Sequence, residues 1–129
     1  MTATPLDVLE TRGLIGAQAA QAGRTFARAY ALVFGAGRPA SLASGHPGAI
    51  DDGVLRRAEA EVDRGMACLD ACGRRVRDEV VNAAVYYRWP RVVRRDDARA
   101  RGQLDRLRLG LNALAEGVGG PRDRGGRSP

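Results

Sequence analysis

The sequence predicts an all-α protein, folded as a compact bundle of four to five helices. Several segments repeat apolar residues every three or four positions, and capping or breaking residues flank them. No segment shows the apolar-polar alternation and hairpin turns of β-strands. The 129 residues are 44% hydrophobic and 5% aromatic. This size suits one domain, expected over residues 1–118, with a core of Ala, Val and Leu.

Two helices are expected in the N-terminal part. Thr4-Pro5 is a helix start, because a threonine oxygen can accept from first-turn amides and a first-turn proline loses no useful donor. We expect this helix to reach about Arg12, where Gly13 follows. A longer helix is expected over 16–34. Its predicted apolar stripe consists of Ala19, Ala22, Phe26, Tyr30 and Val33.

Two segments are expected to lack regular structure. Residues 35–50 are rich in Gly, Pro, Ser and Ala and have no helical period, which predicts a flexible connector. His46, the only histidine, lies in it and is expected to be solvated. The C-terminal residues 119–129 are expected to form a disordered tail.

Three further helices are expected after the connector. The third begins at Asp51-Asp52, whose carboxylates suit a helix N-terminus, and ends or kinks at Gly73. The fourth is expected to end at about Arg88, because a proline disfavours helical geometry in the residue before it. A basic turn over 91–96 and a last helix from Asp96-Asp97 to Gly117 complete the bundle.

These three helices have predicted inward-facing stripes. The expected core positions are Leu55, Ala58, Val62, Met66 and Leu69 in the third helix, Val76, Val80, Ala83, Ala84 and Tyr87 in the fourth, and Leu104, Leu107, Leu111 and Leu114 in the last.

No motif in the sequence indicates catalysis. Phosphate-binding loops, dinucleotide-binding loops and zinc-protease or hydrolase signatures are absent. Cys68 and Cys72 with one remote histidine are too few for a structural zinc site, and they are expected to be buried structural thiols. We therefore expect a non-enzymatic protein with no catalytic residue, metal or cofactor. No apolar run could span a membrane, so a cytoplasmic location is expected.

Positive charge gathers between residues 88 and 108. All 21 basic residues of the chain are arginines. This bias alone supports no function, because the codon usage of a GC-rich genome produces it. The position is more informative, since residues 88–108 hold eight arginines and three acids. The residues expected to bind nucleic acid or another partner are Arg88, Trp89, Arg91, Arg94, Arg95, Arg99, Arg101, Arg106 and Arg108.

Trp89 has two open interpretations. It is either a core residue that anchors the turn between the last two helices or a contact residue that stacks on a base. Some of the arginines are expected to pair with neighbouring acids rather than with a partner.

Two stretches resemble known proteins. Residues 6–35, and VRDEVVNAAVYYRWPRVVRR (76–95) followed by QLDRLRLGLNALAEG (103–117), resemble small helical proteins of prophages and gene-transfer-agent-like elements in GC-rich bacteria. A Trp-Pro pair before a Leu-rich helix resembles the DNA-binding end of sigma-like and antitermination-type regulators. The resemblance implies a regulatory protein that uses a helix-turn-helix-like region.

The leading hypothesis is therefore a phage-type regulatory protein. Its expected partner is nucleic acid or an acidic protein surface such as that of RNA polymerase. The alternative is an oligomeric assembly module, such as a small DNA-packaging (terminase) subunit, because the Ala-rich stripe of 19–33 would allow close contact between chains. Self-association remains open under both hypotheses.

Overall fold

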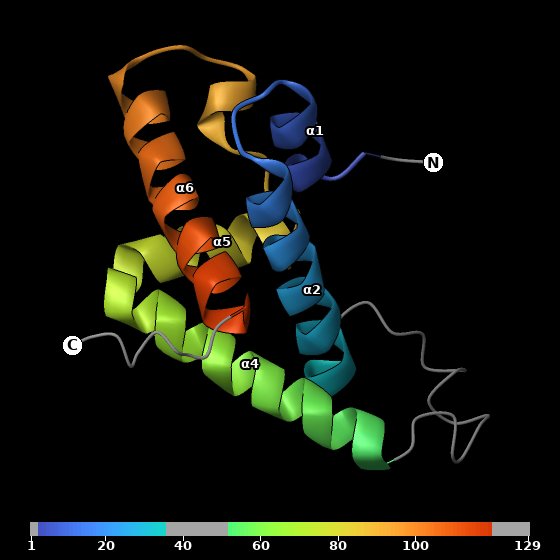
Figure 1. Ribbon diagram of the computed structural model, residues 1–129. Coiled ribbons are helices and arrows are strands. Elements are labelled where there is room, and N and C mark those ends of the chain that lie inside the picture. The colour runs from blue at the N-terminus through green and yellow to red at the C-terminus, as the bar shows by residue number, and fades with distance from the viewer. Residues whose placement is uncertain (1–2, 36–51, 120–129) are drawn as a thin grey trace.

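The protein is all-α, as predicted. The computed structural model describes residues 3–35 and 52–119 (Figure 1). These ranges contain five α-helices, one short 3₁₀ helix and no strand. The elements are α1 (Pro5–Thr11), α2 (Ala17–Phe34), α4 (Asp52–Cys72), α5 (Arg74–Ala84), η1 (Arg91–Val93) and α6 (Ala98–Gly119). Apart from Gly35 and Gly119, the expected connector and tail lie outside the described residues, as does His46.

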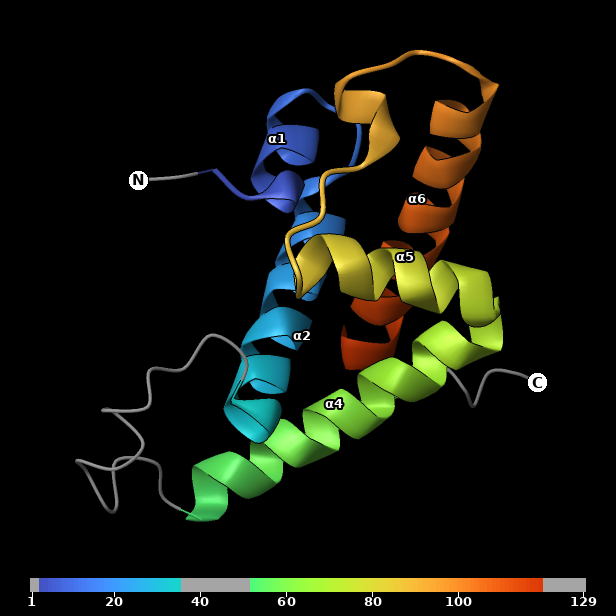
Figure 2. The ribbon, with the colours of Figure 1, turned by 180° about the vertical axis from the view of Figure 1, so that it is seen from behind.

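Helix α6 is the centre of the arrangement. It packs against α2, α4 and α5, and its first half also contacts η1 (Figures 1 and 2). Helix α4 runs across the lower ends of α2 and α6 in Figure 1, and α5 crosses in front of α6 in Figure 2. The short α1 packs on α2 and α5. Three of the other helices therefore bury a face against α6.

One hydrophobic cluster joins all five helices. The predicted α6 stripe is fully confirmed, because its four leucines are all buried. In α2 the small residues of the predicted stripe are buried, and Phe26 is the largest fully buried side chain of the described residues. In α4 the stripe is only partly confirmed, since Leu55 and Met66 are half-buried. Cys68 and Cys72 are free, half-buried thiols and not the buried ones expected.

Several glycines at helix crossings face side chains of another helix, and Gly65 and Gly110 are two of them. A Cβ atom added to Gly65 of α4 would lie 2.5 Å from Cδ1 of Phe26. A Cβ atom added to Gly110 of α6 would lie 2.5 Å from Cγ2 of Val80 in α5. Real Cβ atoms do not approach carbon so closely, so each glycine gives the facing side chain the space that a methyl group would occupy.

Helix α1 begins where its sequence predicts, and ion pairs hold it against α2. Thr4 Oγ1 accepts the Asp7 amide at 3.2 Å, while an Asp7 carboxylate oxygen accepts the Thr4 amide at 3.0 Å. Arg24 of α2 pairs with Asp7 at 2.8 Å and with Glu10 at 2.6 Å. The backbone amide of Thr4 and the Arg24 guanidinium lower the pKa of Asp7. This network joins α1 to α2.

Two predicted helix ends and one inward position were wrong. Helix α5 ends at Ala84, before the expected Arg88, and Tyr87 is 57% exposed with a left-handed φ of 57°. The reversal has a packing cause, because Val92 and Val93 of η1 pack against the core and the chain must turn back toward α6 to place them. The expected basic turn therefore contains η1. At the other end, α6 continues past Gly117 to Gly119.

The glycine crossing makes a stability prediction. Gly65→Ala should lower the free energy of unfolding by about 1–3 kcal/mol, because the new methyl group overlaps the Phe26 ring within a closely packed core. Thermal or urea unfolding followed by circular dichroism measures this change.

Gly102→Ala in α6 is the matched control. The nearest atom to its added Cβ is a flexible Arg106 nitrogen at 3.5 Å. Alanine should raise stability there by roughly 0.5–1 kcal/mol through its better helix propensity. Equal effects of the two substitutions would contradict the close-approach explanation.

Candidate nucleic-acid interface

An open groove lies where α5, residues 88–95 and the first half of α6 meet. Its volume is about 980 Å³, and Figure 2 shows the three segments that surround it. Among the described residues, seven arginines line it against a single carboxylate, that of Glu79. The arginines are Arg75, Arg88, Arg91, Arg94, Arg95, Arg99 and Arg106. The groove therefore concentrates positive charge on a concave surface, which raises the local electrostatic potential.

The chain reversal after α5 forms one side of this groove. The left-handed φ of Tyr87 turns the backbone, and the Arg88 amide donates to the Asn82 carbonyl at 2.9 Å. A non-glycine residue in this conformation costs about 1–2 kcal/mol. Such strain persists only where surrounding contacts enforce it. Here the buried Pro90 and the packing of η1 hold the turn, which places Arg88 and Trp89 at the groove.

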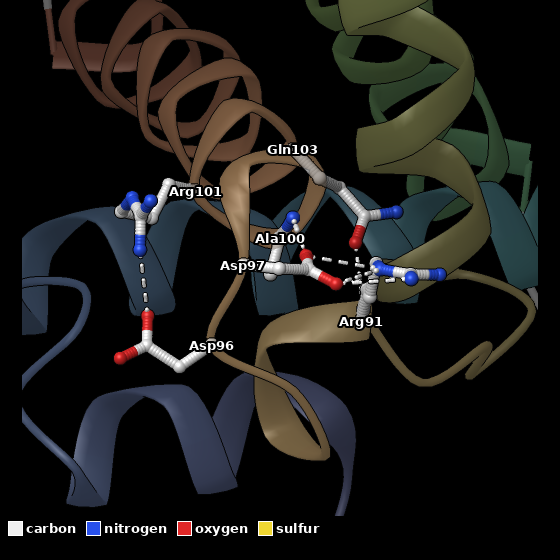
Figure 3. Close-up of polar contacts among 6 residues, drawn as sticks. All are labelled: Arg91, Asp96, Asp97, Ala100, Arg101 and Gln103. Atoms are coloured by element: carbon white, nitrogen blue, oxygen red, sulfur yellow. Dashed lines mark hydrogen bonds and ion pairs between the residues drawn. The ribbon is translucent and has the colours of Figure 1, made fainter.

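A network of hydrogen bonds among Arg91, Asp97, Ala100 and Gln103, called here the Asp97 frame, fixes the loop of residues 88–95 to the N-terminal part of α6 (Figure 3). The Arg91 guanidinium donates to both oxygens of Asp97, at 3.0–3.1 Å. Asp97 in turn accepts the Ala100 amide at 2.8 Å and so caps α6. The backbone amide of Arg91 donates to Gln103 Oε1 at 2.6 Å. Together these bonds hold the loop and helix at a fixed spacing.

The same hydrogen bonds determine the charge state of Asp97. The Arg91 hydrogen bonds, followed by the Ala100 amide, lower the pKa of Asp97 to about 2. The Asp97 hydrogen bonds raise the pKa of Arg91 in return. Both groups are therefore fully charged near neutral pH, and Arg91 is already paired within the chain.

A second ion pair in the groove joins α5 to α6. Arg106 donates two hydrogen bonds of 2.9 Å to the two oxygens of Glu79. This two-point geometry is the strong form of an arginine–carboxylate pair. The Glu79 side chain is only 15% exposed. The one carboxylate of the groove is thus engaged by Arg106, whose pKa it raises.

The other five groove arginines have no such partner. Within the described parts of the chain, their side chains make no ion pair and no hydrogen bond. All five are exposed, namely Arg75, Arg88, Arg94, Arg95 and Arg99. Their guanidinium groups are available to bind phosphate or carboxylate groups of another molecule.

Trp89 is exposed at the groove and is not a core residue. It is 43% exposed and makes no ring contact or hydrogen bond with another described residue. The interpretation of Trp89 as a core anchor is therefore wrong. Its neighbour Pro90 is the buried residue of the pair.

Seven of the nine predicted residues line the groove, and two lie elsewhere. Arg101 pairs with Asp96 at 3.1 Å, on the other side of the α6 N-terminus from Arg91 (Figure 3). Arg108 donates to the Leu14 carbonyl at 2.7 Å and so ties α6 to the turn after α1. Sequence reasoning missed Arg75, Asn82 and Gln103, which also line the groove. The charge distribution along the sequence could not identify Arg75, because it lies in a segment of slightly negative net charge. It comes to the groove only because α5 crosses α6.

The connection between the last two helices is longer than expected. Residues 85–97 join α5 to α6 and contain η1, so the connection is much longer than the turn of a helix-turn-helix. Helix α6 is also the central core helix and buries its leucine stripe within the chain. The groove, rather than a projecting recognition helix, is the distinctive feature of this region.

Other site types find no support in the described ranges 3–35 and 52–119. No three His, Cys, Asp or Glu side chains come together there in a way that could hold a metal ion. None of the helices in these ranges is both long and apolar enough to cross a bilayer. Burial, followed by the nearby Cys68, raises the pKa of the Cys72 thiol, which disfavours a reactive thiolate.

The Asp97 frame makes a pH prediction. Because its folded-state pKa of about 2 lies below the ordinary 3.8, its stabilising effect is complete above about pH 4 and is lost as the pH falls toward 2. Asp97→Asn removes the charge but keeps a good capping side chain. The thermal midpoint of the variant should lie below that of the original chain near neutral pH, and the two should converge at about pH 2. A gap that stays constant down to this pH would contradict the assignment.

The comparisons with known proteins give no family for this chain. No protein-family model, curated protein or solved structure matches it. The groove and its charge distribution are therefore the basis for a functional assignment.

Proposed function

We propose that this chain is a non-enzymatic regulatory protein that binds nucleic acid in the arginine-lined groove. The observation that carries the proposal is a set of five exposed arginines on one concave surface, whose side chains make no ion pair or hydrogen bond with another described residue. Of these, Arg95 lies near enough to Asp97 for its charge to help lower the pKa of that carboxyl group. Guanidinium groups bind phosphates through two-point hydrogen bonds, and several of them together favour a polyanion over a single anion.

The remaining groove residues support binding rather than catalysis. Among the described residues that line it there is no Ser, Thr, Cys, His, Lys or Asp. Glu79 is the one candidate for a general base, and it is held by Arg106. A groove of this composition offers neither a nucleophile nor a free base, which is the reason for proposing a binding protein.

The regulatory and phage-type parts of the proposal come from the sequence resemblance. They stay predictions, as does the cytoplasmic location. An acidic protein surface, such as that of RNA polymerase, would also pair with guanidinium groups and is the competing partner for the same groove.

Self-association is a second candidate function, supported by a different surface. The small residues of α2 that motivated it are buried in the chain's own core. However, an aromatic cluster is exposed, with Phe34 61% and Tyr86 52% accessible. Their rings lie 4.6 Å and 6.2 Å from that of Tyr30, centroid to centroid. Exposed aromatic groups are enriched at protein interfaces, so light scattering at micromolar concentration is the appropriate measurement.

Charge removal in the groove tests the proposal. Arg94, Arg95 and Arg99, all replaced by alanine, should weaken binding to short DNA and RNA by at least about tenfold, because each removes a phosphate contact. The slope of log K against log salt should become shallower by about 2–3. Fluorescence anisotropy across about 50–200 mM salt measures both quantities. Arg91 is left intact because its pair with Asp97 holds the loop.

Two control proteins make this experiment specific. Arg56, Arg57 and Arg64 are exposed on α4 and lie outside the groove, so replacing them by alanine removes the same charge and should change binding little. Glu79→Gln removes the negative charge of the groove's carboxylate while its amide oxygen can still accept a hydrogen bond from Arg106, so it should tighten binding. Circular dichroism verifies that each variant is folded.

Two results would argue against the proposal. Equal losses from the groove triple and the α4 triple would show that binding depends only on net charge. Tighter binding to a polyglutamate of matched charge than to nucleic acid would favour the acidic-protein alternative.

A further inference from the structure

We infer that the groove takes a single-stranded nucleic acid rather than a duplex, with Trp89 stacked on a base and the unpaired arginines on the neighbouring phosphates. This inference rests on the proposed function and specifies its ligand. Three properties of the site carry it: its concave shape, the exposed Trp89, and the amides of Asn82 and Gln103 among the arginines.

Shape is the first argument against a duplex. A helix or ribbon that reads the base edges of a duplex enters its major groove, which is about 12 Å wide. Here α6 is buried along its leucine stripe, and its N-terminus is occupied by the Asp97 cap and the Arg91 pair. The available arginines instead line a hollow of about 980 Å³. A hollow of this size is comparable with large small-molecule pockets, and so it suits a few flexible nucleotides rather than a rigid double helix.

Trp89 is the second argument. A tryptophan ring is a large apolar surface, and this one has no internal ring contact or hydrogen bond with a described residue. Unpaired bases expose their faces and stack on such rings, whereas paired bases inside a duplex do not. The backbone reversal at Tyr87 and the buried Pro90 fix the position of Trp89 next to Arg88. The site thus combines a stacking surface with phosphate-binding groups.

The two amide side chains complete the chemistry. Gln103 uses its oxygen to accept the Arg91 amide, which leaves its NH₂ group to donate. The Asn82 side chain is exposed and makes no hydrogen bond with another described residue. Amides of this kind can pair with the edges of splayed bases. Stacking itself accepts any base, so we expect weak sequence preference.

Trp89 also provides the probe for the experiment, because it is the only tryptophan. The full chain is titrated with oligo-dT and oligo-U of about twelve nucleotides, with a hairpin duplex, and with polyphosphate of matched charge. Intrinsic fluorescence and anisotropy are both followed. Single strands should quench the fluorescence of Trp89 and bind about tenfold more tightly than the duplex. The DNA and RNA arms identify the preferred sugar, and preference for either supports the inference.

Substitution of Trp89 distinguishes binding through base stacking from binding through phosphate contacts. Trp89→Ala should weaken binding to single strands by about 10- to 100-fold, whereas Trp89→Phe should retain most of it. Neither change should affect polyphosphate, which has no bases. Because the side chain is exposed, both variants should fold, and circular dichroism checks this.

The outcomes distinguish this inference from the proposed function. If the duplex binds as tightly as single strands, or if Trp89→Ala leaves single-strand binding unchanged, then the single-strand inference is wrong. Arginine-dependent binding would in that case still support the proposed function. If no nucleic acid binds in a manner that depends on Arg94, Arg95 and Arg99, the proposed function fails together with the inference.

Discussion

The close approach of α6 to its neighbours is the constraint on which this structure depends. With few aromatic residues, the chain cannot fill wide spaces between helices, so the helices must lie close together. Gly110 of α6 admits Val76 and Val80 of α5, and Gly65 of α4 lies against Leu114 of α6 as well as the Phe26 ring of α2. The resulting contacts set the crossing of α5 over α6. Since those two helices carry two sides of the arginine groove, core packing also determines the geometry of the candidate site.

The groove divides its arginines into two kinds. Arg91 and Arg106 are held by carboxylates, and they brace the loop and α5 against α6. The others keep their charge exposed in the hollow. Under the proposed function, this division would favour binding of an anionic ligand, since little side-chain or loop entropy need be lost in shaping the groove. Ion-pair partners, and not position in the sequence, thus decide which groove arginines are engaged within the chain.

Much of the candidate site could be predicted from the distribution of charge along the sequence. The residues that this prediction misplaced or missed have clear physical explanations. The density of arginines in 88–108 identified most of the groove, because residues near in sequence remain near in a short loop and the following helix turns. Arg101 and Arg108 were misplaced because charge counting ignores which side of a helix a residue occupies. Arg75 was missed because it comes from another helix. Trp89 could not be assigned by sequence, since either Trp89 or Pro90 could have been the buried member of the pair.

The sequence by itself determined the all-α class, the starts of α1, α2 and α6, and the buried leucines of α6. These features follow from local rules, namely capping chemistry and a helical period. Tertiary structure decided where α5 ends, because packing of Val92 and Val93 requires a reversal at Tyr87 that no local signal marks. It also decided which arginines are free, because ion pairs such as Arg106–Glu79 join residues far apart in the chain. Long-range contacts of this kind form only when the helices pack.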